Sequence, residues 1–97
     1  MQEVELHINE KGRGGFYISE DGEQLGVMQI GITGKDLIAF HTEVSPDKKG
    51  KGIGKILLET MVDYARGHGL KVIPLCPYVY AQFKRNNEKY ADIWKKE

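Results

Sequence analysis

The chain has 97 residues, enough for one hydrophobic core and too few for two, so we expect a single domain over residues 1–97. Its 14 basic and 14 acidic side chains balance, which argues against nucleic acid as a partner. No apolar run is long enough to cross a bilayer and no secretory signal is visible, so no membrane partner is expected. A lone cysteine favours a reducing, cytoplasmic setting.

The first half of the chain predicts four strands. Val4, Leu6 and Ile8 alternate with polar residues, as in a strand with one buried face. Residues 12–15 are expected to turn the chain. Three more apolar runs follow, separated by short turns with Asp-Gly and Thr-Gly pairs, at residues 16–19, 25–32 and 37–44. Turns this short join antiparallel strands into a meander.

Residues 52–66 predict an amphipathic helix, followed by a glycine-rich stop at residues 67–69. Residues 70–76 are mostly apolar and predict a strand covered on both faces. Strand, helix and strand in this order form a right-handed parallel crossover. We therefore expect an α/β (α+β) fold with a mixed, mostly antiparallel sheet. The apolar positions on one face of the predicted helix are Ile53, Ile56, Leu57, Met61, Tyr64 and Ala65.

Pro74 lies inside the last predicted strand. Because proline has no N–H to donate, it weakens pairing with the strand at residues 37–44, and the two strands are expected to part there. Residues 78–86 predict a short helix, with Pro77 in its first turn. A final helix is expected to carry the remaining large side chains, Tyr90, Ile93 and Trp94.

A glycine-rich loop, V-S-P-D-K-K-G-K-G-I-G-K, runs from Val44 to Lys55 and leads into the predicted helix. Its glycines allow tight turns and close approach to a ligand, and the first amides of a helix lack intrahelical partners. The helix dipole adds about half a positive charge, and four lysines add full charges, so a pyrophosphate would fit. A flexible, basic surface turn is the alternative interpretation.

Two familiar phosphate loops do not match this segment. A Walker loop needs a hydroxyl residue after Gly-Lys, but Ile56 follows Lys55. The dinucleotide fingerprint G-x-G-x-x-G fails because Leu57 stands where its third glycine is required. The pattern Q/R-x-x-G-x-G/A does fit, with Lys49 in the first place after a V-x-P lead. This pattern resembles the coenzyme A loop of the GNAT superfamily of acyl-CoA-dependent N-acyltransferases.

The resemblance covers residues 36–76 and includes two short motifs, H-T-E-V at residues 41–44 and C-P-Y at residues 76–78, that are similar to those of minimal GNAT-like proteins. Residues 9–15 leave no room for the two helices that a typical GNAT carries after its first strand. The resemblance implies acetyl-CoA (coenzyme A) as donor, an amine as acceptor and no metal. It assigns the donor to Val44, Lys49, Gly50, Lys51, Gly52, Ile53, Gly54 and Lys55.

Cys76 is the first candidate catalytic residue, as a nucleophile. It precedes a predicted helix start, where unpaired amides favour the thiolate, and the resemblance places it near the acyl end of the donor. The alternative is a small buried apolar residue. His41 could take a proton from an amine or from Cys76, and Glu43 projects to the same side of the strand as a second base. Isolated histidines on strands are more often structural.

Three tyrosines are candidates for the protonating hydroxyl that many GNATs use, which would act on the leaving thiolate, although aromatic residues on short helices are more often core: Tyr78, Tyr80 and Tyr90. The residues alone do not choose among them. They also leave open whether the amine attacks the thioester directly or Cys76 accepts the acyl group first. A non-catalytic module that senses or carries acetyl-CoA is the second function that fits, because the region that shapes the acceptor pocket in longer members is missing.

Overall fold

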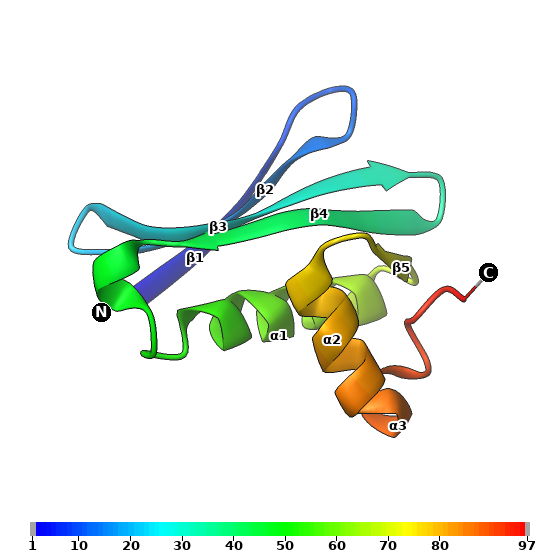
Figure 1. Cartoon of the computed structure of the whole chain (residues 1–97). Helices are drawn as coiled ribbons and strands as arrows, with labels where there is room; N and C mark the ends of the chain where they lie inside the picture. Colours follow the sequence, from blue (N-terminus) through cyan, green and yellow to red (C-terminus); the bar gives the residue numbers. More distant parts are fainter. Residues whose placement is uncertain (1, 97) are drawn as a thin grey trace.

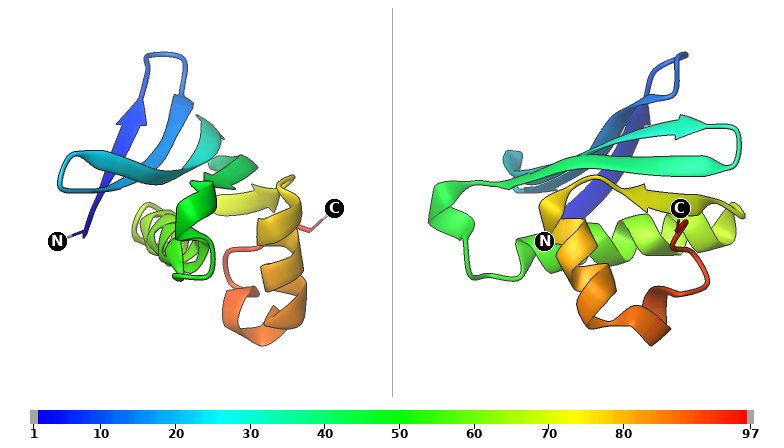
Figure 2. Two further views of the ribbon diagram at one scale, coloured as in Figure 1. Left: turned by 60° about the vertical axis from the view of Figure 1, so that its left-hand side comes forward. Right: turned by 45° about the vertical axis from the view of Figure 1, so that its right-hand side comes forward.

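The computed structural model describes residues 2–96, which form one five-stranded sheet with α1 and α2 on the same face (Figures 1 and 2). The first four strands pair antiparallel in chain order and the fifth pairs parallel with the fourth. The mixed, mostly antiparallel sheet and the α/β class are thus confirmed. The strands are β1 (Gln2–Ile8), β2 (Arg13–Glu20), β3 (Glu23–Thr33), β4 (Asp36–Val44) and β5 (Lys71–Pro74).

A tight turn at residues 9–12 joins β1 directly to β2, so no helix lies between them. The Asn9 side chain accepts hydrogen bonds from two backbone amides of this turn, and Gly12 has a φ of 78°. Gly14 and Gly15 were expected in the turn but belong to β2. The backbones approach so closely here that a Cβ on Gly14 would lie 1.8 Å from the His7 carbonyl oxygen.

The core lies between the sheet and the helix α1 (Ile53–Gly67), which crosses from β4 to β5. Ile56 and Tyr64, predicted on its apolar face, lie at the margin and are half-buried. The helix ends as expected, with Gly69 at a φ of 66°. The residues that α1 buries are Ile53, Leu57, Leu58, Met61, Val62 and Ala65. Among residues 2–96, no helix is long and apolar enough to cross a membrane.

The pairing between β4 and β5 is short. It runs from Asp36 opposite Lys71 to Ala39 opposite Pro74, and the Cys76 N–H then donates to the Ala39 carbonyl at 2.8 Å. Beyond this point β4 continues to Val44 while the chain turns into α2 (Pro77–Arg85). The strands therefore part at Pro74, as predicted, and β5 is shorter than the predicted residues 70–76 and is not buried on both faces.

The C-terminal segment corrects the prediction of a final helix carrying Trp94. Helix α3 (Asn87–Tyr90) ends early because the chain turns back to β5. There Val72 donates to the Ile93 carbonyl at 2.6 Å and accepts from the Lys95 amide at 2.9 Å. Residues 91–95 therefore cover the outer edge of β5.

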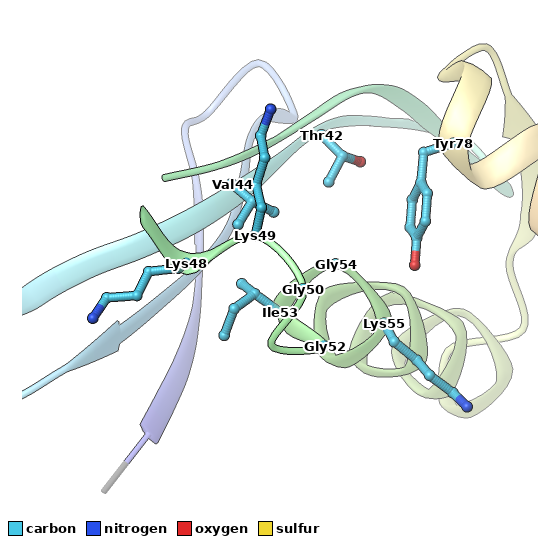
Figure 3. A pocket seen from close by; sticks show the side chains of 10 residues that line it. All are labelled: Thr42, Val44, Lys48, Lys49, Gly50, Gly52, Ile53, Gly54, Lys55 and Tyr78. Carbon is cyan, nitrogen blue, oxygen red and sulfur yellow. The ribbon is translucent and has the colours of Figure 1, made fainter. Parts of the chain in front are cut away.

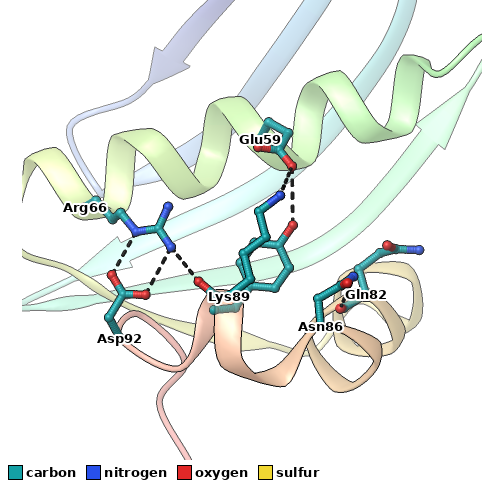
Figure 4. A network of polar contacts seen from close by, with 7 residues as sticks. Glu59, Arg66, Gln82, Asn86, Lys89 and Asp92 are labelled. Atoms are coloured by element: carbon teal, nitrogen blue, oxygen red, sulfur yellow. Dashed lines mark hydrogen bonds and ion pairs between the residues drawn. The ribbon is translucent and has the colours of Figure 1, made fainter.

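Two ion pairs fasten this end of the chain to α1, and we call them the C-terminal clasp (Figure 4). The Arg66 guanidinium donates to both carboxylate oxygens of Asp92 at 2.8 and 3.0 Å. The Lys89 ammonium donates to Glu59 at 3.0 Å. The Arg66 bond to Asp92 holds the pKa of that carboxyl below its ordinary value, and Lys89 does the same for the pKa of Glu59.

Candidate donor and acceptor site

A pocket of about 390 Å³ opens between the end of β4, the glycine-rich loop and the N-terminus of α1 (Figure 3). We call it the donor pocket. Of the residues predicted to hold the donor, Lys51 is exposed outside it and the others line it. The full lining is Thr42, Val44, Lys48, Lys49, Gly50, Gly52, Ile53, Gly54, Lys55 and Tyr78.

The loop backbone at the mouth of α1 offers amides without helical partners, and we call it the anion cradle for the ligand type that these donors suit. Gly50 and Gly52 have φ values of 85° and 76°, which L side chains rarely adopt, and the space where their Cβ atoms would project is open. Gly52 caps α1, and its carbonyl accepts from the Ile56 amide at 3.1 Å. The amides of residues 53–55 therefore have no carbonyl to bond within the helix. Oxygens of a pyrophosphate suit these donors.

Three lysines lie at the rim of the donor pocket. Figure 3 shows the Lys49 side chain extending past Val44, while the ammonium groups of Lys48 and Lys55 point away from the pocket in opposite directions. They surround the cradle with positive charge rather than reach into it. The inner donors of this site are therefore backbone amides.

The end of β4 presents a free backbone edge to the donor pocket. Ser45 donates to the Leu25 carbonyl at 2.9 Å, so its N–H faces β3. Because successive residues of a strand turn their backbone groups to opposite edges, the amides of His41 and Glu43 also face β3. Those of Thr42 and Val44 face the gap that the departure of β5 leaves. An extended ligand can pair with them as a strand would.

Cys76 lies at the far end of this gap and is buried, with 2% of its surface exposed. It is the N-cap of α2, as the sequence predicts, and its sulfur lies 3.3 Å from the Thr42 hydroxyl. Sequence reasoning missed Thr42. The signal was present in the H-T-E-V motif, because alternation along a strand places Thr42 on the face opposite His41 and Glu43.

His41 and Glu43 lie on the face of the sheet that carries no helix. Their side chains are 52% and 69% exposed, and His41 Nε2 lies 3.5 Å from a Glu43 carboxylate oxygen. They line a second cavity of about 500 Å³, which shares Thr42, Val44 and Lys49 with the donor pocket. The sheet therefore separates His41 from the Cys76 thiol but leaves it beside the free edge of β4.

Comparison with known proteins decides the family. Residues 15–93 match the family described as GCN5-related N-acetyl-transferase. The chain belongs to this family. The chain is also 32% identical over 74 residues to N-acetyltransferase 8B of Rattus norvegicus, and the match covers 65% of this chain and 31% of that protein. It thus spans about a third of that relative's length.

Solved structures show the same GCN5-related acetyltransferase fold. A GCN5-like putative N-acetyltransferase from Staphylococcus aureus is 26% identical with a TM-score of 0.70, over 96% of this chain and 89% of that one. The ribosomal-protein-S18-alanine N-acetyltransferase from Escherichia coli reaches the same TM-score at 14% identity, over 76% of this chain and 66% of that one. The second likeness concerns the fold alone.

Among the three candidate tyrosines, only Tyr78 lines the donor pocket. Tyr80 is exposed and contacts Trp94, while Tyr90 is buried against Glu59. Gly54 makes room for Tyr78, because a Cβ there would lie 3.3 Å from its ring. Burial raises the pKa of the Tyr78 hydroxyl above its ordinary value, with smaller contributions from nearby charges. A tyrosine is protonated at neutral pH even at its ordinary pKa, so this hydroxyl can donate a proton.

Proposed function

We propose that this protein binds acetyl-CoA in the donor pocket and transfers the acetyl group to an amine. The observation that supports this most directly is that the anion cradle at α1 continues into the free edge of β4. In this arrangement the amides of residues 53–55 hold the pyrophosphate, and Thr42 and Val44 pair with the amide groups of the pantetheine arm. The thioester then lies toward Thr42 and Cys76.

Two sets of side chains serve the transfer. On the open face of the sheet, Glu43 or His41 takes a proton from the acceptor ammonium, which frees the nitrogen lone pair. The nitrogen forms a C–N bond to the acetyl carbon, the C–S bond breaks, and the sulfur leaves with the bonding electrons. Tyr78, which lines the donor pocket and carries its proton at neutral pH, supplies the proton that makes the leaving sulfur a thiol. The nitrogen then releases its second proton to solvent, from which the tyrosine that protonates the sulfur is reprotonated. Burial of Cys76 favours this direct route over an acyl-cysteine.

The second candidate is a non-catalytic module that binds acetyl-CoA or coenzyme A as a sensor or carrier. One observation favours it: the outer face of the sheet, where His41 and Glu43 lie, is open in every view (Figures 1 and 2). A shielded acceptor site excludes water and competing reactions, and an open face does not.

Two measurements test the proposal. Acetyl-CoA and coenzyme A should each raise the melting temperature, because a ligand that binds only the native state stabilises it, by about 2.7 kcal/mol at a hundred times Kd. A screen of amines with acetyl-CoA should then release free thiol with at least one acceptor. A melting temperature that acetyl-CoA leaves unchanged at millimolar concentration rules out the donor site. Stabilisation without turnover of any amine identifies the sensor or carrier.

A further inference from the structure

The outer face of the sheet carries two adjoining cavities that share Gln24. One is the cavity of about 500 Å³ at His41 and Glu43, beside the donor pocket. The other, of about 460 Å³, lies over β1 and β2 and is bounded by Gly22 in the β2–β3 turn. Both volumes fall within the range of pockets that bind small molecules.

The strand register places residues of both cavities in one row across the outer face of the sheet. Glu5 stands opposite Tyr17, Tyr17 opposite Val27, and Val27 opposite Glu43, so the four side chains form a row on the outer face. Val27 is the floor, with only 8% of its surface exposed. Gly15 has no side chain to stand beside Val27, where a Cβ would lie 3.3 Å from Val27 Cγ2. We call this row the outer trough.

Each end of the outer trough carries a histidine–glutamate pair. On β1, His7 Nε2 lies 2.9 Å from Glu5, and on β4, His41 Nε2 lies 3.5 Å from Glu43. Three strand spacings separate the two carboxylates, which is roughly 14 Å. Only the Glu43 end adjoins Thr42 and Val44 and hence the donor pocket.

The charges around the outer trough favour a cation. Arg13 lies on the same face but its guanidinium stacks over Phe40, 4.7 Å from the ring centroid, and it lines neither cavity. Lys49 lines the trough only at the end that faces the donor pocket, where it adjoins the anion cradle. At the Glu5 end the lining contains a carboxylate and an aromatic ring, Tyr17, both of which attract an ammonium group.

From this arrangement we propose that the acceptor is a linear amine with a second positive charge, a polyamine, bound along the outer trough. The reactive amine lies at Glu43, next to the free edge of β4, and the distant ammonium pairs with Glu5 and lies against Tyr17. The methylene chain crosses the apolar floor at Val27. This inference rests on the proposed acetyl transfer, and it names the acceptor class and the residues that select it.

The test uses spermidine as the probe and butylamine as the singly charged control. In the labelled whole protein, spermidine should shift the amide NMR signals of residues 5, 17, 27 and 43, and butylamine should shift those near residue 43 only. With acetyl-CoA, spermidine should be acetylated at a kcat/KM about tenfold or more above that of butylamine, since a second charge-assisted contact adds over about 1.4 kcal/mol.

Two variants with the same change in net charge locate the effect. Glu5→Gln should reduce the advantage of spermidine over butylamine about tenfold, whereas Glu3→Gln, on the same strand but outside both cavities, should leave it unchanged. Equal effects of the two variants would indicate general attraction of cations and overturn the proposal. The Glu5→Gln protein should retain the stabilisation by acetyl-CoA, which shows that it is folded.

The result also separates this inference from the proposed function. If acetyl-CoA stabilises the protein but millimolar spermidine shifts none of the four signals and gains no advantage over butylamine, the trough does not select polyamines and the donor site stands. If acetyl-CoA does not bind, the proposed transfer fails. Spermidine shifts along the trough, reduced in Glu5→Gln, would in that case still support a polyamine site.

Discussion

Single residues decide what the donor pocket can admit, and its glycines do so in different ways. Gly52 has a backbone conformation that side chains rarely adopt, whereas Gly54 is helical and leaves space for the Tyr78 ring. A substitution at Gly52 therefore disturbs the cradle for the pyrophosphate. A substitution at Gly54 disturbs the position of the hydroxyl that we propose as the proton donor.

Gly52→Val should abolish the stabilisation by acetyl-CoA. A β-branched side chain at a φ of 76° costs about 1–2 kcal/mol and obstructs approach to the loop amides. Gly34→Val is the matched control, because Gly34 also has a positive φ and open space around it but lies in the β3–β4 turn, outside the donor pocket. Thermal unfolding should show similar destabilisation of both proteins without ligand, and a shift with acetyl-CoA only in Gly34→Val.

Cys76→Ala should lower stability by about 1–2 kcal/mol and leave the acetyl-CoA shift nearly intact, since the loop and not the thiol holds the pyrophosphate. In the native protein, iodoacetamide should modify this buried thiol more slowly than a free cysteine. Fast modification that acetyl-CoA prevents, together with loss of turnover in Cys76→Ala, would instead establish the acyl-cysteine route. Thr42→Val then tests whether the neighbouring hydroxyl supports that reactivity.

At the scale of elements, the site depends on the difference in length between β4 and β5. Pro74 has no N–H for the ladder, and after it the chain turns into α2. The last residues of β4 are thereby paired on one edge only. The early end of β5 therefore opens the site, and the C-terminal clasp holds α3 and the segment after it against α1.

Hydrogen exchange should reveal the free edge of β4. The amides of Thr42 and Val44 face the gap and should exchange rapidly in the free protein, while those of His41 and Glu43 pair with β3 and should exchange slowly. Acetyl-CoA should slow the exchange of the first pair about tenfold or more and leave the second pair nearly unchanged. Equal protection of all four amides without ligand would contradict a strand edge that is open to the pantetheine arm.

The C-terminal clasp should make stability depend on acid pH. The pKa of Glu59 is lowered chiefly by its hydrogen bond from Lys89, and the pKa of Asp92 by its bond from Arg66. A lowered folded pKa means stabilisation that is present above the unfolded pKa and lost as pH falls through the folded one. The melting temperature should therefore fall between about pH 5 and pH 3, and more steeply in the native protein than in a Glu59→Gln, Asp92→Asn double variant.

At the scale of the whole molecule, one core supports both the sheet and the site. Phe83 on α2 is fully buried and packs against Tyr90 and Trp94. The same helix begins at Cys76 and carries Tyr78 in the donor pocket. Loss of packing under α2 therefore loosens the site and the fold together.

Phe83→Ala should destabilise the protein by about 3–5 kcal/mol, through lost burial and the cavity left behind. A domain of this size has a total stability of about 5–15 kcal/mol, so a large part of it would be lost. Leu75→Ala is the control, because Leu75 is 60% exposed and its truncation should change stability by less than about 0.5 kcal/mol. Urea unfolding of both variants measures the difference, and similar losses would contradict the contribution of α2 to the core.

The sequence by itself determined where the strands, the crossover helix and the glycine-rich loop lie along the chain. These features depend on local periodicity, turn residues and glycine spacing, which neighbouring residues specify. It also predicted that the strands part at Pro74, because the missing N–H is a property of that residue. The C-terminal segment was misjudged, since the apolar Ile93 and Trp94 suit a helix equally well until β5 offers an edge to pair with.

Only the tertiary structure decided which candidate side chains meet. The choice of Tyr78 over Tyr80 and Tyr90 required the position of α2 relative to α1, and the contact of Cys76 with Thr42 joins residues far apart in the chain. The outer trough depends on the register of β1 through β4, which places Glu5 in a row with Glu43. Register and packing arise from the whole sheet and core, so no local pattern in the sequence contains them.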